Sequence, residues 1–181
     1  LEAGAAIEQP TDDGTTPLSA ASFNGEIECV RLLLEAGAAT DQADAEGLTP
    51  LSIACQQGHF ECAQLLRDAG ADINQADEDG ATPLYIACQN GHLECARLLL
   101  EANAAVDQAR VAGSTPLLIA CHFGHLEVAK LLSSYGASRA ATPFGTPEEI
   151  ANGEGHADLA AWLVASRSWT PLQHLEACPR L

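Results

Sequence analysis

The sequence predicts an all-α solenoid of stacked helix–turn–helix units that are joined by extended β-hairpin loops. The dipeptide Thr-Pro recurs at a constant interval, at positions 16–17, 49–50, 82–83 and 115–116. Each pair opens a short apolar stretch that ends at a glycine. A second apolar stretch with a Leu-Leu pair follows at helical spacing. Such registered self-similarity is the pattern of a repeat architecture rather than of one irregular core.

The local signals within one unit predict where its helices begin and end. In the third unit, Thr82 is expected to cap a helix, and Pro83 at the first helical position loses no N–H that the helix needs. A helix is predicted at about 83–90 and a second at about 93–102. A glycine or asparagine after the second helix supplies the left-handed residue that stops it. The polar, turn-rich stretch 72–80 then indicates an extended hairpin that leads to the next unit.

These landmarks divide the chain into successive units. The predicted ranges are the tail of a preceding repeat at 1–10, four repeats at 11–43, 44–76, 77–109 and 110–140, an atypical repeat at 141–164, and a capping helix or truncated repeat at 165–181. Residues 1–9 match 34–42, so we expect the chain to begin inside a repeat, as a fragment of a longer array. Thr146-Pro147 comes two positions earlier than the period of the repeat predicts, and Glu148 replaces the core leucine.

The amino-acid composition limits the classes of molecule that we expect to bind this chain. The chain has 25 Asp and Glu against 8 Lys and Arg, a net charge of −17. Phosphates repel such a chain, so nucleic acids and anionic membranes are not expected as partners. No apolar run approaches the roughly 20 residues that a membrane span needs. The cysteine usage favours a reducing compartment, the cytoplasm or the nucleus.

Cysteines and histidines recur with the repeat, which favours structural roles for them. The cysteines form two series that share the period of the Thr-Pro pairs, Cys29, Cys62, Cys95 and Cys55, Cys88, Cys121. We expect them to be small core residues, because none lies two to four residues from another as zinc ligands do.

The histidines that follow the glycine between the helices are His59, His92, His125 and His156, and we expect them to cap or brace that turn. Catalysis needs one site rather than four copies, and no phosphate loop, Gly-x-Ser-x-Gly or His-Glu-x-x-His is present. No catalytic, cofactor-binding or metal-binding residue is therefore predicted.

A unit of this length with Thr-Pro-Leu and Gly-His resembles the ankyrin repeat. The segment from Asp77 to Glu94 is nearly the family pattern, and the resemblance covers roughly residues 1–164. The chain departs from the family where a histidine usually follows Thr-Pro-Leu, since Ser19, Ser52, Tyr85 and Leu118 stand there. The resemblance implies a non-catalytic scaffold for protein–protein interaction. The alternative is a targeting or regulatory segment of a larger enzyme, channel or ubiquitin-ligase adapter.

The resemblance also implies a concave groove lined by the hairpin tips and the exposed face of each first helix. These positions vary between units while the scaffold repeats, so we expect them to carry specificity. The helix positions are Ser22, Phe23, Gln56, Gln57, Gln89, Asn90, His122 and Phe123. The tip positions are Asp13, Thr15, Glu46, Leu48, Asp79, Ala81, Val111 and Ser114. The stripe changes from acidic and polar in the first three units to apolar in the fourth, which has Phe123, Val111 and Leu118. Exposed aromatic residues such as Phe123 are candidate interface anchors. The alternative is that Phe23 and Phe123 pack under the hairpin loop of the next unit.

The expected partner is another protein, basic or of mixed charge, and no cofactor is expected. The chain is expected to be a monomer, with end-to-end stacking through an apolar end as the alternative. The stretch around Asn74 resembles the acceptor site of an asparaginyl hydroxylase in eukaryotic ankyrin arrays, so Asn74 is a candidate modification site.

Overall fold

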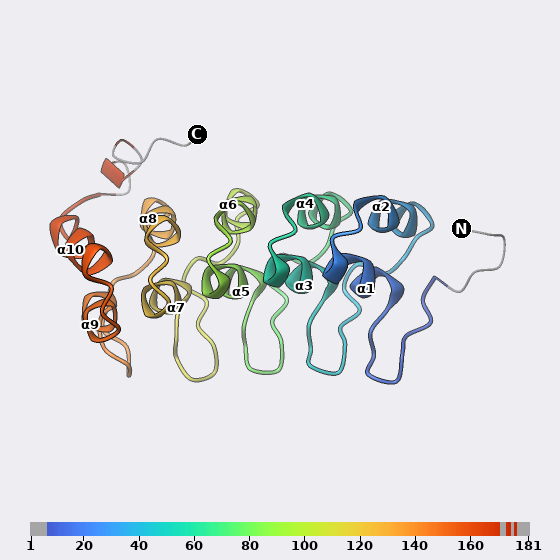
Figure 1. Cartoon of the computed structure of the whole chain (residues 1–181), viewed down its shortest axis with the longest axis horizontal. Coiled ribbons are helices and arrows are strands. Elements are labelled where there is room, and N and C mark those ends of the chain that lie inside the picture. Colours follow the sequence, from blue (N-terminus) through green and yellow to red (C-terminus); the bar gives the residue numbers. More distant parts are fainter. Residues whose placement is uncertain (1–6, 171–172, 175, 177–181) are drawn as a thin grey trace.

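The computed structural model describes residues 7–170, 173, 174 and 176, and this part of the chain is a row of ten helices in five pairs (Figure 1). The first helices of the pairs are α1 (Pro17–Asn24), α3 (Pro50–Gln57), α5 (Pro83–Asn90), α7 (Pro116–His122) and α9 (Pro147–Gly153). The second helices are α2 (Ile27–Glu35), α4 (Phe60–Asp68), α6 (Leu93–Glu101), α8 (Leu126–Ser134) and α10 (Ala157–Ala165). The predicted all-α solenoid is confirmed.

Local chemistry sets the helix ends. The Thr82 hydroxyl accepts a hydrogen bond from the backbone N–H of Tyr85 at 3.2 Å, and Pro83 occupies the first helical position. Gly91 ends α5 in the left-handed conformation, with φ at 74°. The helix predicted at 83–90 therefore has the expected bounds, and the one predicted at 93–102 ends one residue earlier. Asn103 stands where other units have glycine and adopts a positive φ of 64°.

The core is a continuous layer between successive helix pairs. The first helices pack against one another in sequence from α1 to α9, and the second helices do so from α2 to α8. Leu84 and Leu99 lie in this layer with no exposed surface. Burying one leucine side chain contributes about 2 kcal/mol to stability. Each short helix is therefore stabilised mainly by packing against the neighbouring helices of the stack.

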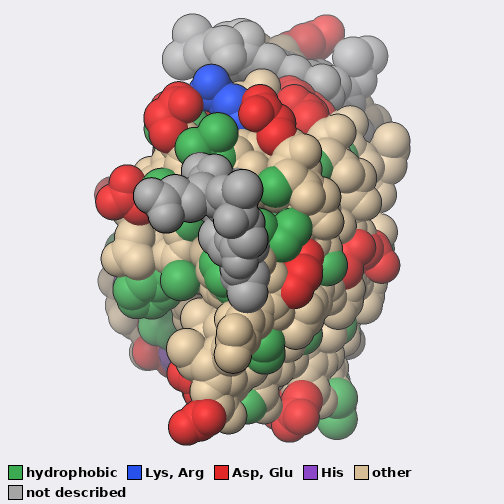
Figure 2. All heavy atoms as spheres, turned by 90° about the vertical axis from the view of Figure 1, so that its right-hand side faces the viewer, with side chains coloured by type: hydrophobic (Ala, Val, Ile, Leu, Met, Phe, Trp, Pro, Cys, Tyr) green, Lys and Arg blue, Asp and Glu red, His purple; other side chains and the backbone are tan. Residues whose placement is uncertain are grey.

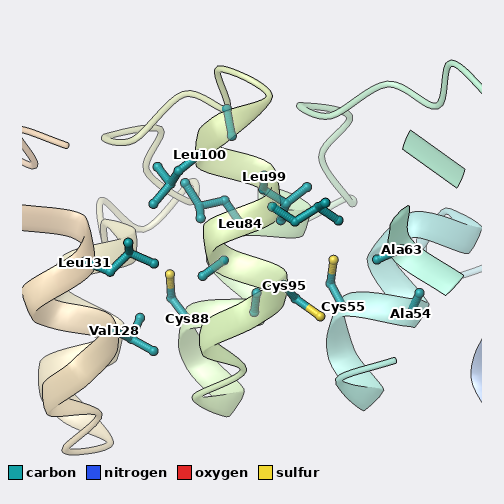
Figure 3. Close-up of a cluster of buried hydrophobic side chains, with 14 of the residues drawn as sticks. Ala54, Cys55, Ala63, Leu84, Cys88, Cys95, Leu99, Leu100, Val128 and Leu131 are labelled. Carbon is teal, nitrogen blue, oxygen red and sulfur yellow. The ribbon is translucent and has the colours of Figure 1, made fainter. Parts of the chain in front are cut away.

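Most cysteines lie in the same layer, as predicted. Cys55, Cys88 and Cys95 are buried among leucine and alanine side chains (Figure 3). Burial raises the pKa of the Cys88 thiol and raises that of Cys121 to about 12, so these thiols stay protonated and apolar in character. Cys29 is the exception, since it is exposed on α2 at the end of the stack. All six cysteines in the described residues are free thiols.

In every described unit after the first, the histidine that follows the inter-helix glycine links neighbouring helix pairs. The Nε2–H of His92 donates to the carbonyl oxygen of Gln56 at 3.1 Å. The same bond recurs from His59, His125 and His156 to the preceding unit, at 3.0 to 3.1 Å. Although these residues precede the second helices, their side chains do not cap them. The predicted structural role is therefore confirmed as a brace between repeats.

The loops between pairs are extended fingers with tight turns at their tips (Figure 1). In the second finger, the N–H of Asp44 donates to the carbonyl of Leu48 at 3.1 Å, and the N–H of Gly47 donates back to Asp44 at 3.0 Å. No finger in the described part of the chain forms a regular strand, and one isolated bridge joins Thr142 to Gly145. The predicted β-hairpin loops are therefore hydrogen-bonded turns without a ladder in the described fingers. Single bonds link some neighbouring fingers, such as that from the N–H of Ala45 to the carbonyl of Asp13 at 2.9 Å.

The predicted repeat boundaries stay a prediction. The first four helix pairs each lie within one predicted unit, and the fifth pair ends at Ala165, one residue beyond the unit predicted at 141–164. Part of the segment predicted as a capping helix or truncated repeat, 165–181, lies outside the described residues, as does most of the tail at 1–10. Within the described residues, no helix has the length and apolar character needed to cross a membrane.

His174 packs at the far end of the stack between two tryptophans. Its ring centroid lies 5.6 Å from that of Trp162 and 5.3 Å from that of Trp169. Burial, and then the charge of Arg139, lowers the pKa of His174 below its usual value. The folded state therefore favours the neutral ring. The contribution of this contact to stability is fully present only above the pKa of His174 in the unfolded chain, about 6.5.

We expect the contact of His174 to weaken as the pH falls from about 6.5 through the lower folded pKa, because the unfolded segment binds the proton more readily. Tryptophan fluorescence followed against pH should change in that window, and the change should disappear in His174→Gln. A transition of equal size in the variant would assign it to another group.

Candidate functional site

The fingers present acidic side chains through a recurring local turn. In the third finger, the Asp77 carboxylate accepts from the backbone N–H groups of Asp79 and Ala81, at 3.0 and 2.8 Å. Asp44 makes the equivalent pair of bonds in the second finger. These two aspartates therefore build the turn, which leaves Glu78 and Asp79 exposed at its tip. Figure 2 shows Asp and Glu side chains at the finger end of the stack, at the bottom of the view.

The first finger differs in sequence but also carries a fixed charge. The hydroxyl of Thr11 donates to the Asp13 carboxylate, and the N–H of Thr15 donates to it at 3.2 Å. These bonds, Thr11 first, lower the pKa of Asp13. Asp13 is therefore ionised at neutral pH.

Three adjoining hollows lie between the fingers and the first helices, and together we call them the finger groove. The first, of about 360 Å³, lies between the first and second fingers. The second, of about 460 Å³, lies between the second, third and fourth fingers. The third, of about 260 Å³, lies between the fourth and fifth fingers. Gln56 lines the first two hollows and Arg110 lines the last two, so the three hollows adjoin one another along the row of fingers.

The second hollow is acidic. Glu46, Glu78 and Asp79 line it together with the amides Gln89 and Asn90. Glu46, Glu78 and Asp79 are all exposed, so a partner can reach these carboxylates. We call this the acidic hollow.

Arg110 forms the wall at which the acidic hollow ends. Its guanidinium pairs with Asp79 and lies over the ring of Tyr85, 5.6 Å from the ring centroid. The Tyr85 side chain, followed by the charges of Asp79 and Asp77, raises the pKa of Arg110 against the opposing effect of burial. The arginine is held by its own protein, and no Lys or Arg of the described residues forms an ion pair with Glu46 or Glu78.

The third hollow is apolar. Tyr85, Leu118, Ile119, Phe144 and Ile150 form most of its lining. Leu118, expected in the apolar part of the exposed stripe, is instead buried and forms part of the floor. We call this the apolar hollow.

The structure brings together most of the predicted groove residues. Those that line the finger groove are Thr15, Phe23, Glu46, Leu48, Gln56, Asp79, Ala81, Gln89, Asn90, Ser114 and His122. Asp13, Gln57, Val111 and Phe123 are exposed but line none of the three hollows. Phe23 and Phe123 are about half exposed, so neither is fully covered by a finger. An anchoring role for either ring stays a prediction.

Two predicted contact residues are buried. Ser22 is fully buried, because it lies one full period before the core residue Cys55 and shares its place in the stack. Ala81 is also buried and contributes to the floor of the acidic hollow rather than to an exposed tip. Strict use of the repeat register would have replaced Ser22 with Asn24, which is exposed and lines the first hollow.

Asn74 belongs to a structural ladder on the loops that follow the second helices. Its side-chain oxygen accepts from the backbone N–H of Ala105 at 2.9 Å. Carboxylates at Glu8, Asp41 and Asp107 make the same bond in other units, at 2.7 to 2.9 Å. Asn74 is exposed, so an enzyme could reach it, and its hydroxylation stays a prediction.

No group of three or more His, Cys, Asp or Glu side chains in the described residues is arranged to hold a metal ion. The finger groove offers carboxylates, amides and apolar side chains on a rigid frame. Such an arrangement can recognise a partner by charge and shape.

A family model described as "Ankyrin repeats (3 copies)" matches residues 1–77 and 69–143, which cover most of the chain. A search of curated proteins finds no match. Ankyrin repeats are a general module for protein–protein interaction and are typically non-catalytic. With stacked helix pairs, extended fingers and a constant repeat period matching this model, the chain belongs to the ankyrin-repeat family.

Proposed function

We propose that this chain is a non-catalytic binding module whose finger groove holds a basic segment of a partner protein. The chain acts in the cytoplasm or the nucleus, and neither nucleic acid nor a membrane surface is the ligand. The acidic hollow is the observation that carries the proposal, because it gathers Glu46, Glu78 and Asp79 around one accessible depression.

Electrostatics favours a cationic ligand at this place. The net charge of −17 attracts basic segments at long range and speeds their encounter. Glu46 and Glu78 then offer carboxylates that no basic side chain of the described residues neutralises through an ion pair. The hydrogen bonds from the histidines to the preceding units and the turns at the finger tips hold the groove in shape before binding. Binding therefore orders few side chains of this protein.

Selection of random peptides displayed on phage, with the immobilised protein as target, tests the proposal. We expect the enriched sequences to carry Lys or Arg. Their synthetic peptides should bind in fluorescence anisotropy and lose affinity as salt is added. The double variant Glu46→Gln/Glu78→Gln should weaken binding by about fivefold, as expected for two partly exposed ion pairs.

The control is Glu35→Gln/Glu101→Gln, which removes the same charge at exposed glutamates on the ends of α2 and α6. This control should bind nearly as the unchanged protein does. An equal loss in both double variants would mean that net charge alone attracts the peptides, and the acidic hollow would not be the site. Enrichment of no sequence at all would count against a peptide-binding groove.

A further inference from the structure

The apolar hollow arises from the irregular fifth unit. The Thr-Pro pair of that unit comes two positions earlier than the period predicts, and the fifth finger is correspondingly shorter. Its turn closes within four residues, since the N–H of Thr142 donates to Gly145 and the N–H of Gly145 donates back, both at 3.0 Å. The fourth finger needs five residues for the same closure, from Arg110 to Ser114.

The short fifth finger packs loosely on the fourth. A Cβ built on Gly47 or Gly80 would meet the backbone of the next finger at 3.0 or 3.1 Å. A Cβ on Gly113 would meet only the Pro143 side chain, at 3.6 Å. The space that a full-length finger occupies elsewhere is therefore partly open here, and the apolar hollow lies beside it.

The polar side chains Tyr85, His122 and Arg110 around the apolar hollow each have a partner within the protein, although the buried Nε atom of Arg110 has none. The Tyr85 hydroxyl donates to Ser114 Oγ at 3.3 Å, and His122 Nδ1 lies 3.0 Å from a Glu154 carboxylate oxygen. Arg110 pairs with Asp79 at the boundary with the acidic hollow. An apolar group can enter without stripping these atoms of their hydrogen bonds, which keeps the cost of desolvation low.

The size of the hollow suits one side chain. Its volume of about 260 Å³ is below the roughly 300–1,000 Å³ of pockets for drug-sized ligands. The exposed ring of Phe144 stands at its edge, and Ile119 and Ile150 line it from α7 and α9. A leucine, isoleucine or aromatic side chain inserted there would bury apolar surface on several sides, as interface anchors do.

We propose that the apolar hollow binds one bulky apolar side chain of the partner segment whose basic residue occupies the acidic hollow. This inference rests on the proposed function and adds a second, apolar requirement to the ligand. Arg110 lies between the two hollows, so the basic and apolar residues of the ligand are held at a recurring spacing. A ligand that is only basic is then a weaker partner than one that carries both features.

The peptides selected on phage test this requirement. We expect enriched sequences to carry Leu, Ile, Phe or Trp at a recurring spacing from Lys or Arg. Replacing that apolar residue of the peptide with alanine should weaken binding by about tenfold or more. The variant Ala112→Trp, at an exposed position lining the hollow, should fill it and cause a similar loss for the original peptide.

The matched control is Ala69→Trp, which adds the same ring at the exposed end of α4 outside the groove. It should leave peptide affinity unchanged, and circular dichroism melting should show both tryptophan variants folded. The alanine-substituted peptide should bind the unchanged protein and Ala112→Trp equally, since neither then gains from the hollow.

The outcomes separate the two proposals. Enriched peptides with basic residues but no recurring apolar residue would overturn this inference and leave the basic-segment function intact. A recurring apolar residue with equal affinity for Ala112→Trp and Ala69→Trp would also overturn it, because the side chain would then bind elsewhere. Absence of any enriched sequence would contradict the proposed function and this inference with it.

Discussion

Replacing Leu99 with alanine is expected to lower the free energy of unfolding by about 3 kcal/mol. Leu99 lies on α6 with no exposed surface, and α6 packs against both α4 and α8. The substitution removes apolar contacts on both sides of one helix and leaves a cavity that short, cross-braced helices cannot readily collapse. Urea denaturation followed by far-ultraviolet circular dichroism measures the loss.

The control for this prediction is Leu32→Ala, which makes the same chemical change in the Leu-Leu pair of α2. Leu32 is 47% exposed, so its replacement should cost less than about 1 kcal/mol. Equal losses for the two variants would contradict the assignment of stability to the layer between helix pairs. Denaturation curves with two steps would instead report that the repeats unfold in separate groups.

Replacing Gly58 with alanine is expected to cost about 2–3 kcal/mol, for two separable reasons. Gly58 has a φ of 76°, which residues with a Cβ rarely adopt. The Cβ of an alanine at this position would also lie 2.5 Å from His92 Nδ1. The ring would have to move, and the bond from His92 to the Gln56 carbonyl would be strained or lost. Urea denaturation gives the total cost.

Gly70→Ala separates the two reasons. Gly70 also has a positive φ, of 92°, but a Cβ there meets nothing within 4 Å. This variant should cost only about 1 kcal/mol, the penalty of the left-handed backbone. In a His92→Ala background, the cost of Gly58→Ala should fall to the cost of Gly70→Ala. If it does not fall, the histidine is not the group that restricts Gly58.

Much of the fold could be predicted because its signals are local and repeated. The Thr82 cap, the Pro83 start and the Gly91 stop act within one helix of the chain, so they set the bounds of α5 without help from tertiary contacts. Periodicity also identified all of the described cysteines except Cys29 as core residues, and the histidines as structural. The bonding partner of each histidine could not be predicted from this pattern, since it lies in the preceding unit, on the carbonyl of a residue near the end of its first helix.

The candidate site was predictable only in outline. The finger tips and first helices do line one groove, yet Ser22 lies in the core and Asn24 lies at the surface. That error came from a shift of one residue in the alignment of the first unit. On a short helix, one residue turns a side chain by about 100°, which is enough to exchange a buried face for an exposed one.

The sequence by itself determined the repeat, the helix ends, the acidic character of the finger tips and the family. Only the tertiary structure decided which copies of a repeated position meet water. Leu32 and Leu98 occupy the same place in their units, but Leu32 is 47% exposed and Leu98 is 4% exposed. The reason is physical: caps and turns act between residues a few positions apart, whereas burial depends on what the neighbouring unit places against each surface. The apolar hollow has the same origin, because a shortened finger leaves uncovered a surface that longer fingers cover elsewhere.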